Sequence, residues 1–240
     1  MYLLLLALAP AVILMMYVYF RDKYEKEPVK LILKGILLGA LIIFPVGLIE
    51  NYIIGFGTGL AKIPKAAYDG FIVAGATEEA FKYFVVFILI WRNRNFNEKF
   101  DGIVYAVSVS LGFAAIENLF YVFSNNSMQV GLLRAFTAVP GHTIFGIVMG
   151  FYLGMARFST HGKGKWLLRA FTIPWLLHGI YDFMIMSGHP ILLLTFIPFL
   201  IFMYRHGLKR MKEFNEQSIF NPANINFMNQ QENNYKDEES

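Results

Sequence analysis

The sequence contains no cysteine, which excludes disulfide bridges, thiolate metal sites and a cysteine nucleophile. It is also poor in charge, because only 16% of its residues are Asp, Glu, Lys or Arg, whereas 56% are hydrophobic. The few charged residues cluster between long apolar runs instead of spreading over a surface. This distribution is typical of an integral membrane protein and leaves no room for a separate soluble module.

Seven apolar runs approach the roughly 20 residues that a helix needs to cross a bilayer. We therefore predict an all-α fold, a polytopic membrane helix bundle of about seven transmembrane helices, within a membrane-embedded domain at residues 1–210. The remainder, 211–240, is rich in Asn, Gln and Glu, and it cannot bury enough apolar surface to offset its ordering entropy. We predict that it is a disordered cytoplasmic tail. The predicted helices are 2–20, 31–50, 67–91, 101–123, 132–156, 167–187 and 189–205.

Positive charge is divided unevenly between alternate connections. One set, at 21–30, 92–100, 157–169 and just after 204, carries 15 Lys and Arg residues, whereas the other set carries only Lys62, Lys65 and Arg134. Positively charged loops stay in the cytoplasm. The N-terminus is therefore expected outside and the C-terminus inside.

Glu78 and Glu79 lie side by side in the middle of the run 67–91. One ionisable side chain at the centre of a bilayer costs about 2.5–3.5 kcal/mol on insertion scales, so two adjacent carboxylates there point to a function. Lys82 follows within one helical turn and can pair with either carboxylate, which lowers the cost of their charge.

Other polar residues reach a similar depth from neighbouring helices. A rise of 1.5 Å per residue places Glu78 and Glu79 about 16–18 Å below the outer boundary, His142 about 15 Å and His178 about 14 Å. Glu117 and Asp182 fall at about 8–9 Å. Titratable groups on four helices therefore share the outer half of the membrane, and Asp182 could fix the tautomer of His178.

A purely structural interpretation exists for each of these residues. Glu78 with Lys82 could be a buried ion pair, and Glu117 with Asn118 could form a hydrogen-bonded patch between helices. His142 could be an interhelical contact. His161, His189 and His206 lie in loops or flanks, where no function is expected. The shared depth of the buried residues favours a functional site over the structural interpretation.

Two schemes of peptide hydrolysis suit these residues. Adjacent carboxylates cannot both ionise cheaply at low dielectric, so one can serve as general base and the other as general acid. The histidines would then stabilise the oxyanion. Alternatively Glu79, His142 and His178 form a two-histidine, one-carboxylate site for a divalent metal such as zinc. The sequence does not choose between them, although it lacks His-Glu-x-x-His and the motifs of membrane aspartyl and serine proteases.

Several motifs together resemble the PrsW family over most of residues 1–210. They are Arg21-Asp22-Lys23-Tyr24-Glu25-Lys26-Glu27-Pro28, Ala76-Thr77-Glu78-Glu79-Ala80-Phe81-Lys82, Phe100-Asp101-Gly102-Ile103-Val104-Tyr105, Gly112-Phe113-Ala114-Ala115-Ile116-Glu117-Asn118, Gly150-Phe151-Tyr152-Leu153-Gly154 and Leu177-His178-Gly179-Ile180-Tyr181-Asp182-Phe183. PrsW proteins are bacterial membrane-embedded proteases, distantly related to the CAAX prenyl endopeptidases and bacteriocin-processing enzymes.

The resemblance implies a multi-pass protease of the bacterial cell membrane. Its activity would be site-1 cleavage of a single-pass anti-sigma factor on the extracytoplasmic side, in response to envelope stress. The implied catalytic residues are Glu78, Glu79 and His178, with His142 as the second imidazole. From their spacing and depth, Lys82, Glu117, Asn118 and Asp182 are expected to support them. The expected partners are this substrate and the lipid bilayer, with no nucleic acid.

Two other functions remain open from the residues. Buried carboxylates and histidines also make the proton relays of a proton- or cation-coupled transporter. A seven-helix receptor is a weaker alternative, and its retinal-binding form is excluded because the run 189–205 contains no lysine for a Schiff base.

The charge asymmetry makes a prediction about orientation. Single cysteines introduced into 51–66 and 124–131 should react with a membrane-impermeant reagent in intact cells, because the 15-to-3 bias places these connections outside. The parent chain has no cysteine to react. Cysteines placed in 92–100 are the matched control and should be labelled only after permeabilisation. The reverse pattern would overturn the orientation.

Overall fold

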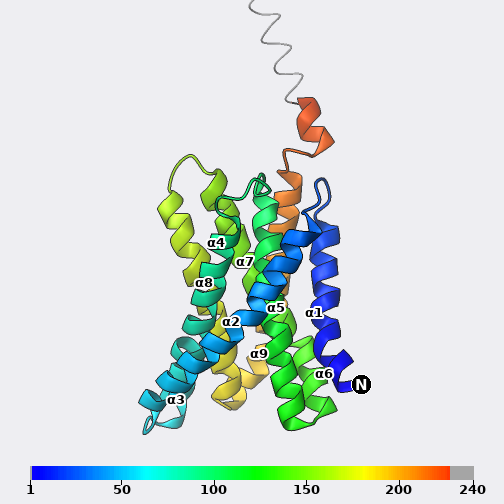
Figure 1. The fold of residues 1–240 in the computed structure, drawn as a ribbon. Coiled ribbons are helices and arrows are strands. Elements are labelled where there is room, and N and C mark those ends of the chain that lie inside the picture. The colour runs from blue at the N-terminus through cyan, green and yellow to red at the C-terminus, as the bar shows by residue number, and fades with distance from the viewer. Residues whose placement is uncertain (1, 228–240) are drawn as a thin grey trace, which may run out of the picture.

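A computed structural model describes residues 2–227 of the protein, and this part of the chain contains helices and short connections but no strand (Figure 1). The all-α prediction is confirmed. In chain order the helices are α1 (Tyr2–Arg21), α2 (Val29–Ile53), η1 (Ile54–Gly57), α3 (Lys62–Tyr68), η2 (Asp69–Ala76), α4 (Thr77–Ile90), α5 (Lys99–Asn125), α6 (Met128–Phe136), α7 (Ala138–Phe158), α8 (Lys163–Met186) and α9 (Pro190–Glu216).

Long helical runs follow the seven predicted ranges, with α3, η2 and α4 together forming the third. Within the described chain, five segments are long and apolar enough to cross a membrane by length and composition: Tyr2–Arg21, Val29–Gly57, Lys99–Asn125, Met128–Phe158 and Pro190–Glu216. Two of the predicted ranges are not in this set. The range 67–91 contains Glu78 and Glu79, and the range 167–187 contains His178 and Asp182. The chain is a multi-pass membrane protein, and the count of seven crossings stays a prediction.

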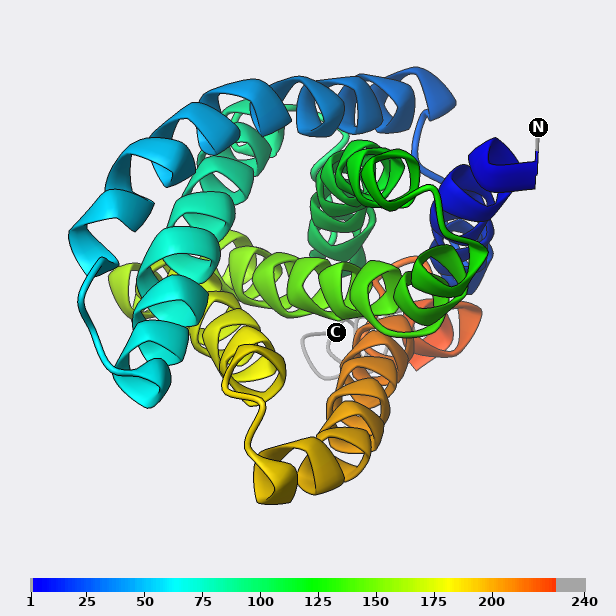
Figure 2. The same ribbon diagram turned by 90° about the horizontal axis from the view of Figure 1, so that it is seen from below.

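Helix α5 lies at the centre of the bundle, between α1, α2 and α7 (Figure 2). Its residues from Phe100 to Ala114 are all buried, so it has no lipid-facing side over this length. The helix packs most extensively against α7 and α2. A helix that is apolar all round is expected in such a position.

Glycine allows α5 and α7 to touch through their backbones. A Cβ atom at Gly102 would lie 2.6 Å from the carbonyl oxygen of Gly150, and one at Gly154 would lie 2.5 Å from the carbonyl oxygen of Lys99. No other residue fits at these distances. Small residues drive helix association in membranes by this kind of close approach.

The outer surface of the bundle is apolar, as a lipid-facing surface must be. On α2 the side chains of Leu33, Leu37, Leu41, Phe44 and Leu48 are each more than half exposed, and their spacing places them along one face. Exposure of this apolar stripe to water would cost free energy. It indicates that α2 lies between α5 and the lipid.

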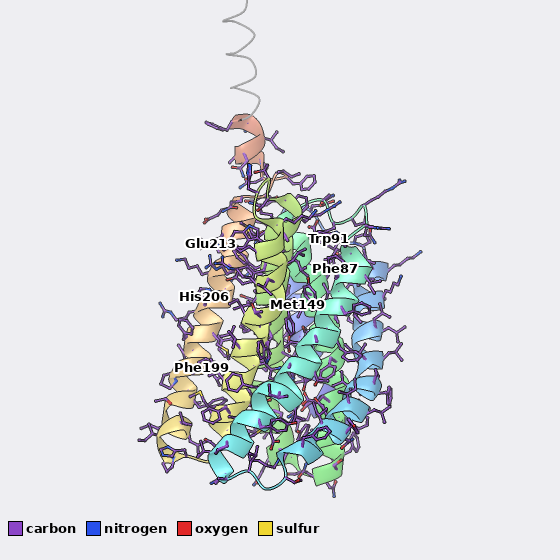
Figure 3. All side chains as sticks on the ribbon, turned by 90° about the vertical axis from the view of Figure 1, so that its left-hand side faces the viewer. Phe87, Trp91, Met149, Phe199, His206 and Glu213 are labelled. Carbon is purple, nitrogen blue, oxygen red and sulfur yellow. The ribbon has the colours of Figure 1, made fainter. Side chains whose placement is uncertain are left out.

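Polar and aromatic residues mark the upper end of the bundle (Figure 3). Phe87 and Trp91 stack near the end of α4, with their ring centroids 4.7 Å apart. Phe199, His206 and Glu213 follow one another up α9, from apolar to charged. Aromatic residues favour the membrane interface, so the helices leave the bilayer near this end.

The alternation of the connections agrees with the pattern of loop charges. The start of α1, the turn before α3, helix α6 and the turn between α8 and α9 lie at the lower end in Figure 1. The connections at 22–28, 91–98 and 159–162 lie at the upper end, together with the end of α9, so the Lys and Arg residues counted in 21–30, 92–100, 157–169 and after 204 lie in or next to this end.

The predicted tail begins within a helix. Residues 211–216 continue α9, and Met211 and Phe214 are buried against the bundle. A short helical stretch follows at 222–227. Residues 228–240 lie outside the described part of the chain, so for them the disordered tail remains a prediction.

Candidate active site

Glu78 and Glu79 occupy the first turn of α4, directly after the π-helix η2. Side chains of α8 fix this segment: the indole Nε1 of Trp175 donates a hydrogen bond to the carbonyl oxygen of Phe71 at 2.6 Å. Gly70 and Gly75 let the segment approach the α8 backbone closely. π-Helical turns occur frequently at functional sites. Here the π-helix η2 directs the carboxylates of Glu78 and Glu79 into the bundle.

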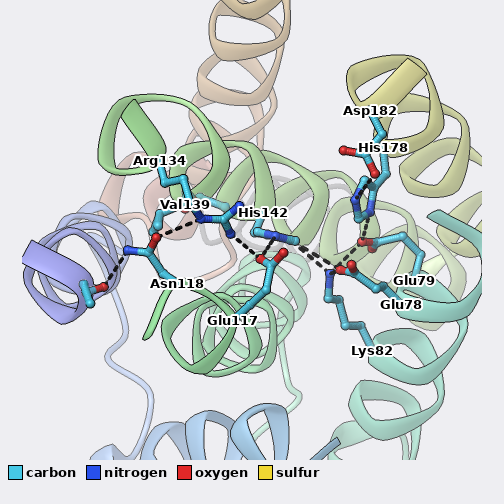
Figure 4. Close-up of polar contacts among 12 residues, drawn as sticks. Glu78, Glu79, Lys82, Glu117, Asn118, Arg134, Val139, His142, His178 and Asp182 are labelled. Carbon is cyan, nitrogen blue, oxygen red and sulfur yellow. Dashed lines mark hydrogen bonds and ion pairs between the residues drawn. The ribbon is translucent and has the colours of Figure 1, made fainter. Parts of the chain in front are cut away.

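The Lys82 ammonium joins three side chains in the buried interior. Its Nζ lies 2.8 Å from Glu78 Oε2, 2.9 Å from Glu79 Oε1 and 3.0 Å from His142 Nδ1 (Figure 4). The Phe113 ring covers its remaining side at 4.3 Å. An ammonium has three donors and no acceptor, so His142 Nδ1 must accept. Nε2 of His142 then carries the proton.

On its other side, His142 contacts a second group of polar residues. Nε2 donates to Glu117 Oε2 at 2.9 Å, and the Arg134 guanidinium pairs with the same oxygen at 2.7 Å. Arg134 Nε also donates to Asn118 Oδ1 at 2.9 Å. Asn118 in turn donates to the carbonyl oxygen of Ala7, which connects the network to α1.

His178 lies between two carboxylates. Its Nδ1 is 3.0 Å from Glu79 Oε1, and its Nε2 is 3.3 Å from Asp182 Oδ2. The ring stacks on Phe145, with centroids 4.8 Å apart. Asp182 therefore holds the orientation of His178, as its position one helical turn later predicts.

All the predicted site residues fall into one connected network (Figure 4). It joins α4, α5, α6, α7 and α8, and it extends from Asn118 and Arg134 at one side to His178 and Asp182 at the other. These side chains therefore lie together, and their depth in the membrane stays a prediction. His161, His189 and His206 take no part in it.

Two charged residues of this region were missed by the sequence analysis. Arg134 was taken as a loop charge, yet it forms an ion pair with Glu117. Glu50 on α2 interacts electrostatically with Glu78 and Glu117, and its Oε1 is buried without a partner. Glu50 is the only acidic residue in the range 31–50, which was a signal that could have identified it.

The network is most buried at Glu79 and its neighbours. The side chains of Glu79 and Lys82 are fully buried, and those of Glu78, His142 and His178 are at most 7% exposed. Glu117 and Asp182 are 18% and 15% exposed. Exposure therefore increases from the glutamate pair toward Glu117 and Asp182, the two residues with the shallowest predicted depth.

The residues fit a divalent metal. One ligand atom each from Glu78, Glu79 and His178 lies within 4.8 Å of the others, and Glu79 Oε2 is buried with no hydrogen-bond partner. Two carboxylate oxygens and one imidazole nitrogen are ligands that zinc accepts. His142, which the sequence analysis placed among the metal ligands, is not part of this group, and its Nδ1 faces the positively charged Lys82 ammonium, whereas both nitrogens of His178 face carboxylates.

The charge balance also favours a cation. Glu78, Glu79, Glu117 and Asp182 carry four negative charges when ionised, and Lys82 and Arg134 carry two positive ones. With neutral histidines the network has a deficit of two positive charges. One divalent ion would remove it, whereas a proton on His178 alone would supply only one charge, because His142 Nδ1 accepts from Lys82.

The comparisons with known proteins cover the whole of this site. The family described as PrsW family intramembrane metalloprotease matches residues 27–204. The chain is 40% identical to Protease PrsW of Oceanobacillus iheyensis, over 89% of this chain and 96% of that protein. It is 36% identical to Protease PrsW of Bacillus subtilis, over 86% and 92% of the two chains, and 34% identical to that of Clostridioides difficile, over 90% and 92%. No solved structure matches the chain.

Removal of the buried ammonium should destabilise the protein strongly. Lys82→Met leaves two buried carboxylates without their shared partner, so we expect a loss of about 3–5 kcal/mol in the free energy of unfolding. Lys65→Met is a matched control, because Lys65 forms a partly exposed pair with Asp69 at the same spacing and should contribute at most about 1 kcal/mol. Thermal unfolding in detergent compares them. Equal unfolding temperatures would contradict the role given to Lys82.

Proposed function

The chain belongs to the PrsW family of intramembrane metalloproteases, and from this membership we propose that it cuts a single-pass membrane protein on the extracytoplasmic side of the membrane. The observation that carries the proposal is the convergence of Glu78, Glu79 and His178 in the buried part of the bundle. The peptidase is favoured over the transporter that the sequence left open, because the family match includes all of these residues.

Without a metal, Glu79 would act as the general base. Its Oε1 is held by Lys82 and His178, whereas its buried Oε2 has no partner and can accept a proton from the attacking water. The same carboxyl group can return that proton to the amine nitrogen as the peptide bond breaks. Glu78 and His178 lie beside it and contact the reacting atoms. Lys82 and His142 act as positioning residues, because Lys82 joins the two carboxylates and His142 links Lys82 to Glu117.

We propose the metal-dependent form of this chemistry. Glu78, Glu79 and His178 would hold the ion, which is zinc in this proposal. When bound, zinc polarises the scissile carbonyl and makes its bound water more acidic. The unpartnered Glu79 oxygen and the deficit of positive charge support this form over carboxylates acting alone.

The proposed topology has seven membrane crossings, with the N-terminus outside and residues 211–240 forming a cytoplasmic tail. Long helical runs at the seven predicted ranges and the alternation of charged connections support it. In this orientation Glu117 and Asp182 face the extracytoplasmic end. The exposure of these two side chains then gives water and the substrate access from outside.

The proposed substrate is an anti-sigma factor with one transmembrane segment, cut as the first step of regulated proteolysis under envelope stress. The resemblance of the motifs to the PrsW family supports this assignment. A site in the outer half of the bilayer suits a cut near the outer boundary. A peptide in extended form would expose its carbonyl, whereas a helical segment hides it in its own hydrogen bonds.

The role of the carboxylates can be tested by conservative replacement. Glu78→Gln and Glu79→Gln keep the side-chain shape but remove a basic carboxylate, so we expect cleavage of co-expressed single-pass anti-sigma factors to fall at least about 100-fold. His178→Ala should behave likewise. Glu216→Gln, at an exposed position near the end of α9, is the control and should cleave normally. Full cleavage by the double glutamine variant would end the carboxylate hypothesis.

The metal proposal makes a prediction about the zinc content of the purified protein. Purified protein should contain about one zinc ion per chain, and the Glu78→Gln, Glu79→Gln double variant should contain much less. Chelation should abolish cleavage, and zinc should restore it. Elemental analysis and the cleavage assay measure the two effects. Activity that survives exhaustive removal of metal would instead favour the carboxylates alone.

The position of the cut is also predicted. Mass spectrometry of the products should place it in the extracytoplasmic juxtamembrane region of the partner. A stiff, alanine-rich helix inserted there should slow cleavage, because unwinding it costs free energy. A glycine- and serine-rich insert of equal length is the matched control. A cut on the cytoplasmic side of the partner's transmembrane segment would refute the proposed access route.

A further inference from the structure

A second group of carboxylates lies at the upper end of the bundle, away from the active site. Asp22, Glu25 and Glu27 come from the connection between α1 and α2, and Glu98 and Asp101 come from the start of α5. One oxygen each from Glu25, Glu27 and Asp101 lies within 4.8 Å of the others. The motifs that contain these residues are not used by the proposed peptidase. We call these five residues the upper carboxylate cluster.

The cluster differs from the active site in having no ammonium or guanidinium paired with it. Within residues 2–227, none of its five carboxylates forms a salt bridge. Lys26 is the cation that acts on Asp22, and its Nζ donates to the backbone carbonyl oxygens of Tyr19, at 2.7 Å, and Asp22. Its ammonium also lies over the Tyr19 ring. Lys26 therefore leaves the carboxylates largely unneutralised.

Several buried oxygens in and beside the cluster have no hydrogen-bond partner. Asp22 is only 1% exposed, yet both of its carboxylate oxygens lack a partner, and they interact electrostatically with Asp101, Glu98 and Glu25. Asp101 is fully buried, and its Oδ1 also lacks a partner. The other unpartnered oxygens are Glu25 Oε2, Glu98 Oε2 and Asn97 Oδ1. Buried acceptors in such number require a donor or a cation.

The other oxygens of the cluster are held in place by the protein. Asp101 Oδ2 accepts the backbone N–H groups of Asn97 and Glu98, as part of a capping box at the start of α5. Glu25 Oε1 accepts from Asn97 Nδ2 at 3.0 Å, and the Tyr105 hydroxyl donates to Glu27 Oε2. Glu25 and Asp101 therefore each have one oxygen fixed and a second oxygen without a hydrogen-bond partner, and Glu27 is fixed through Oε2.

Burial makes the cluster strongly attractive to a positive ion. Burial, and next the neighbouring Asp101 carboxylate, raise the pKa of Asp22 to about 8. Burial and the same neighbour raise the pKa of Glu27 to about 10. A cation bound among the carboxylates would relieve the repulsion between them.

We propose that the upper carboxylate cluster binds one hard divalent cation, Mg²⁺ or Ca²⁺, through Glu25, Glu27 and Asp101, with Asp22 beside them. All the available ligand atoms are oxygens, and Mg²⁺ and Ca²⁺ prefer carboxylate and carbonyl oxygen. The active site differs because it offers a histidine nitrogen. The bound ion ties the connection between α1 and α2 to the start of α5. The site is independent of the peptidase reaction.

Manganese is a suitable probe, because free Mn²⁺ can be counted by electron paramagnetic resonance. Full-length protein in detergent is stripped with a chelator and then titrated with Mn²⁺. The Asp22→Asn, Glu25→Gln double variant should bind about one ion fewer per chain than the wild type. The Glu78→Gln, Glu79→Gln variant should retain that ion, and Glu216→Gln should match the wild type. Competition with Mg²⁺ and with Ca²⁺ identifies the preferred ion.

A second measurement needs no change in the cluster. In the Glu78→Gln, Glu79→Gln protein, bound Tb³⁺ should show emission sensitised by tyrosine, because the Tyr105 hydroxyl contacts Glu27. Mg²⁺ or Ca²⁺ should quench this emission by displacement and should raise the unfolding temperature. The proposal fails if the cluster variant binds as much Mn²⁺ as the wild type. It also fails if Mg²⁺ and Ca²⁺ neither displace Tb³⁺ nor stabilise the protein.

Discussion

The active site depends on the neutralisation of buried carboxylates by one ammonium. Glu78 and Glu79 lie where the dielectric constant is low, and two adjacent negative charges would repel each other strongly there. Lys82 contacts both of them and also His142 on α7, so a single side chain joins α4 to α7. Glu117 and Arg134 form a second ion pair that extends the network to α6. Each polar residue in this part of the bundle is therefore constrained by its neighbours.

Features set by local spacing could be predicted from the sequence. The helix positions follow from the lengths of the apolar runs, and the common depth of Glu78, His142 and His178 follows from the rise of a helix. The contacts of Lys82 with Glu78 and Glu79, and of Asp182 with His178, follow from spacings of three or four residues. In each case the partners lie on one helix or at a depth that counting residues can estimate.

Features set by packing between helices could not be predicted in this way. The pairing of Arg134 with Glu117 depends on how α6 folds back against α5, and the approach of Glu50 depends on the rotation of α2. The upper carboxylate cluster joins two connections that are far apart in sequence, whose charges resemble those of ordinary solvated loops. The burial of Met211 and Phe214 likewise depends on the tertiary contacts of α9. The catalytic roles rest on the proposed chemistry and not on the geometry alone.

The π-helix η2 has a consequence for how this sequence can change. A π-helical turn holds one residue more than an α-helical turn, and a residue added to or removed from a helix rotates everything beyond it by about 100°. A change that converted 69–76 to regular α-helix at the same length would therefore turn Glu78 and Glu79 away from His142 and His178, although every side chain of the network would still be present. Removal of one residue together with that conversion would largely compensate for the rotation. The helical form of this segment is thus as much a determinant of the site as the identity of its residues.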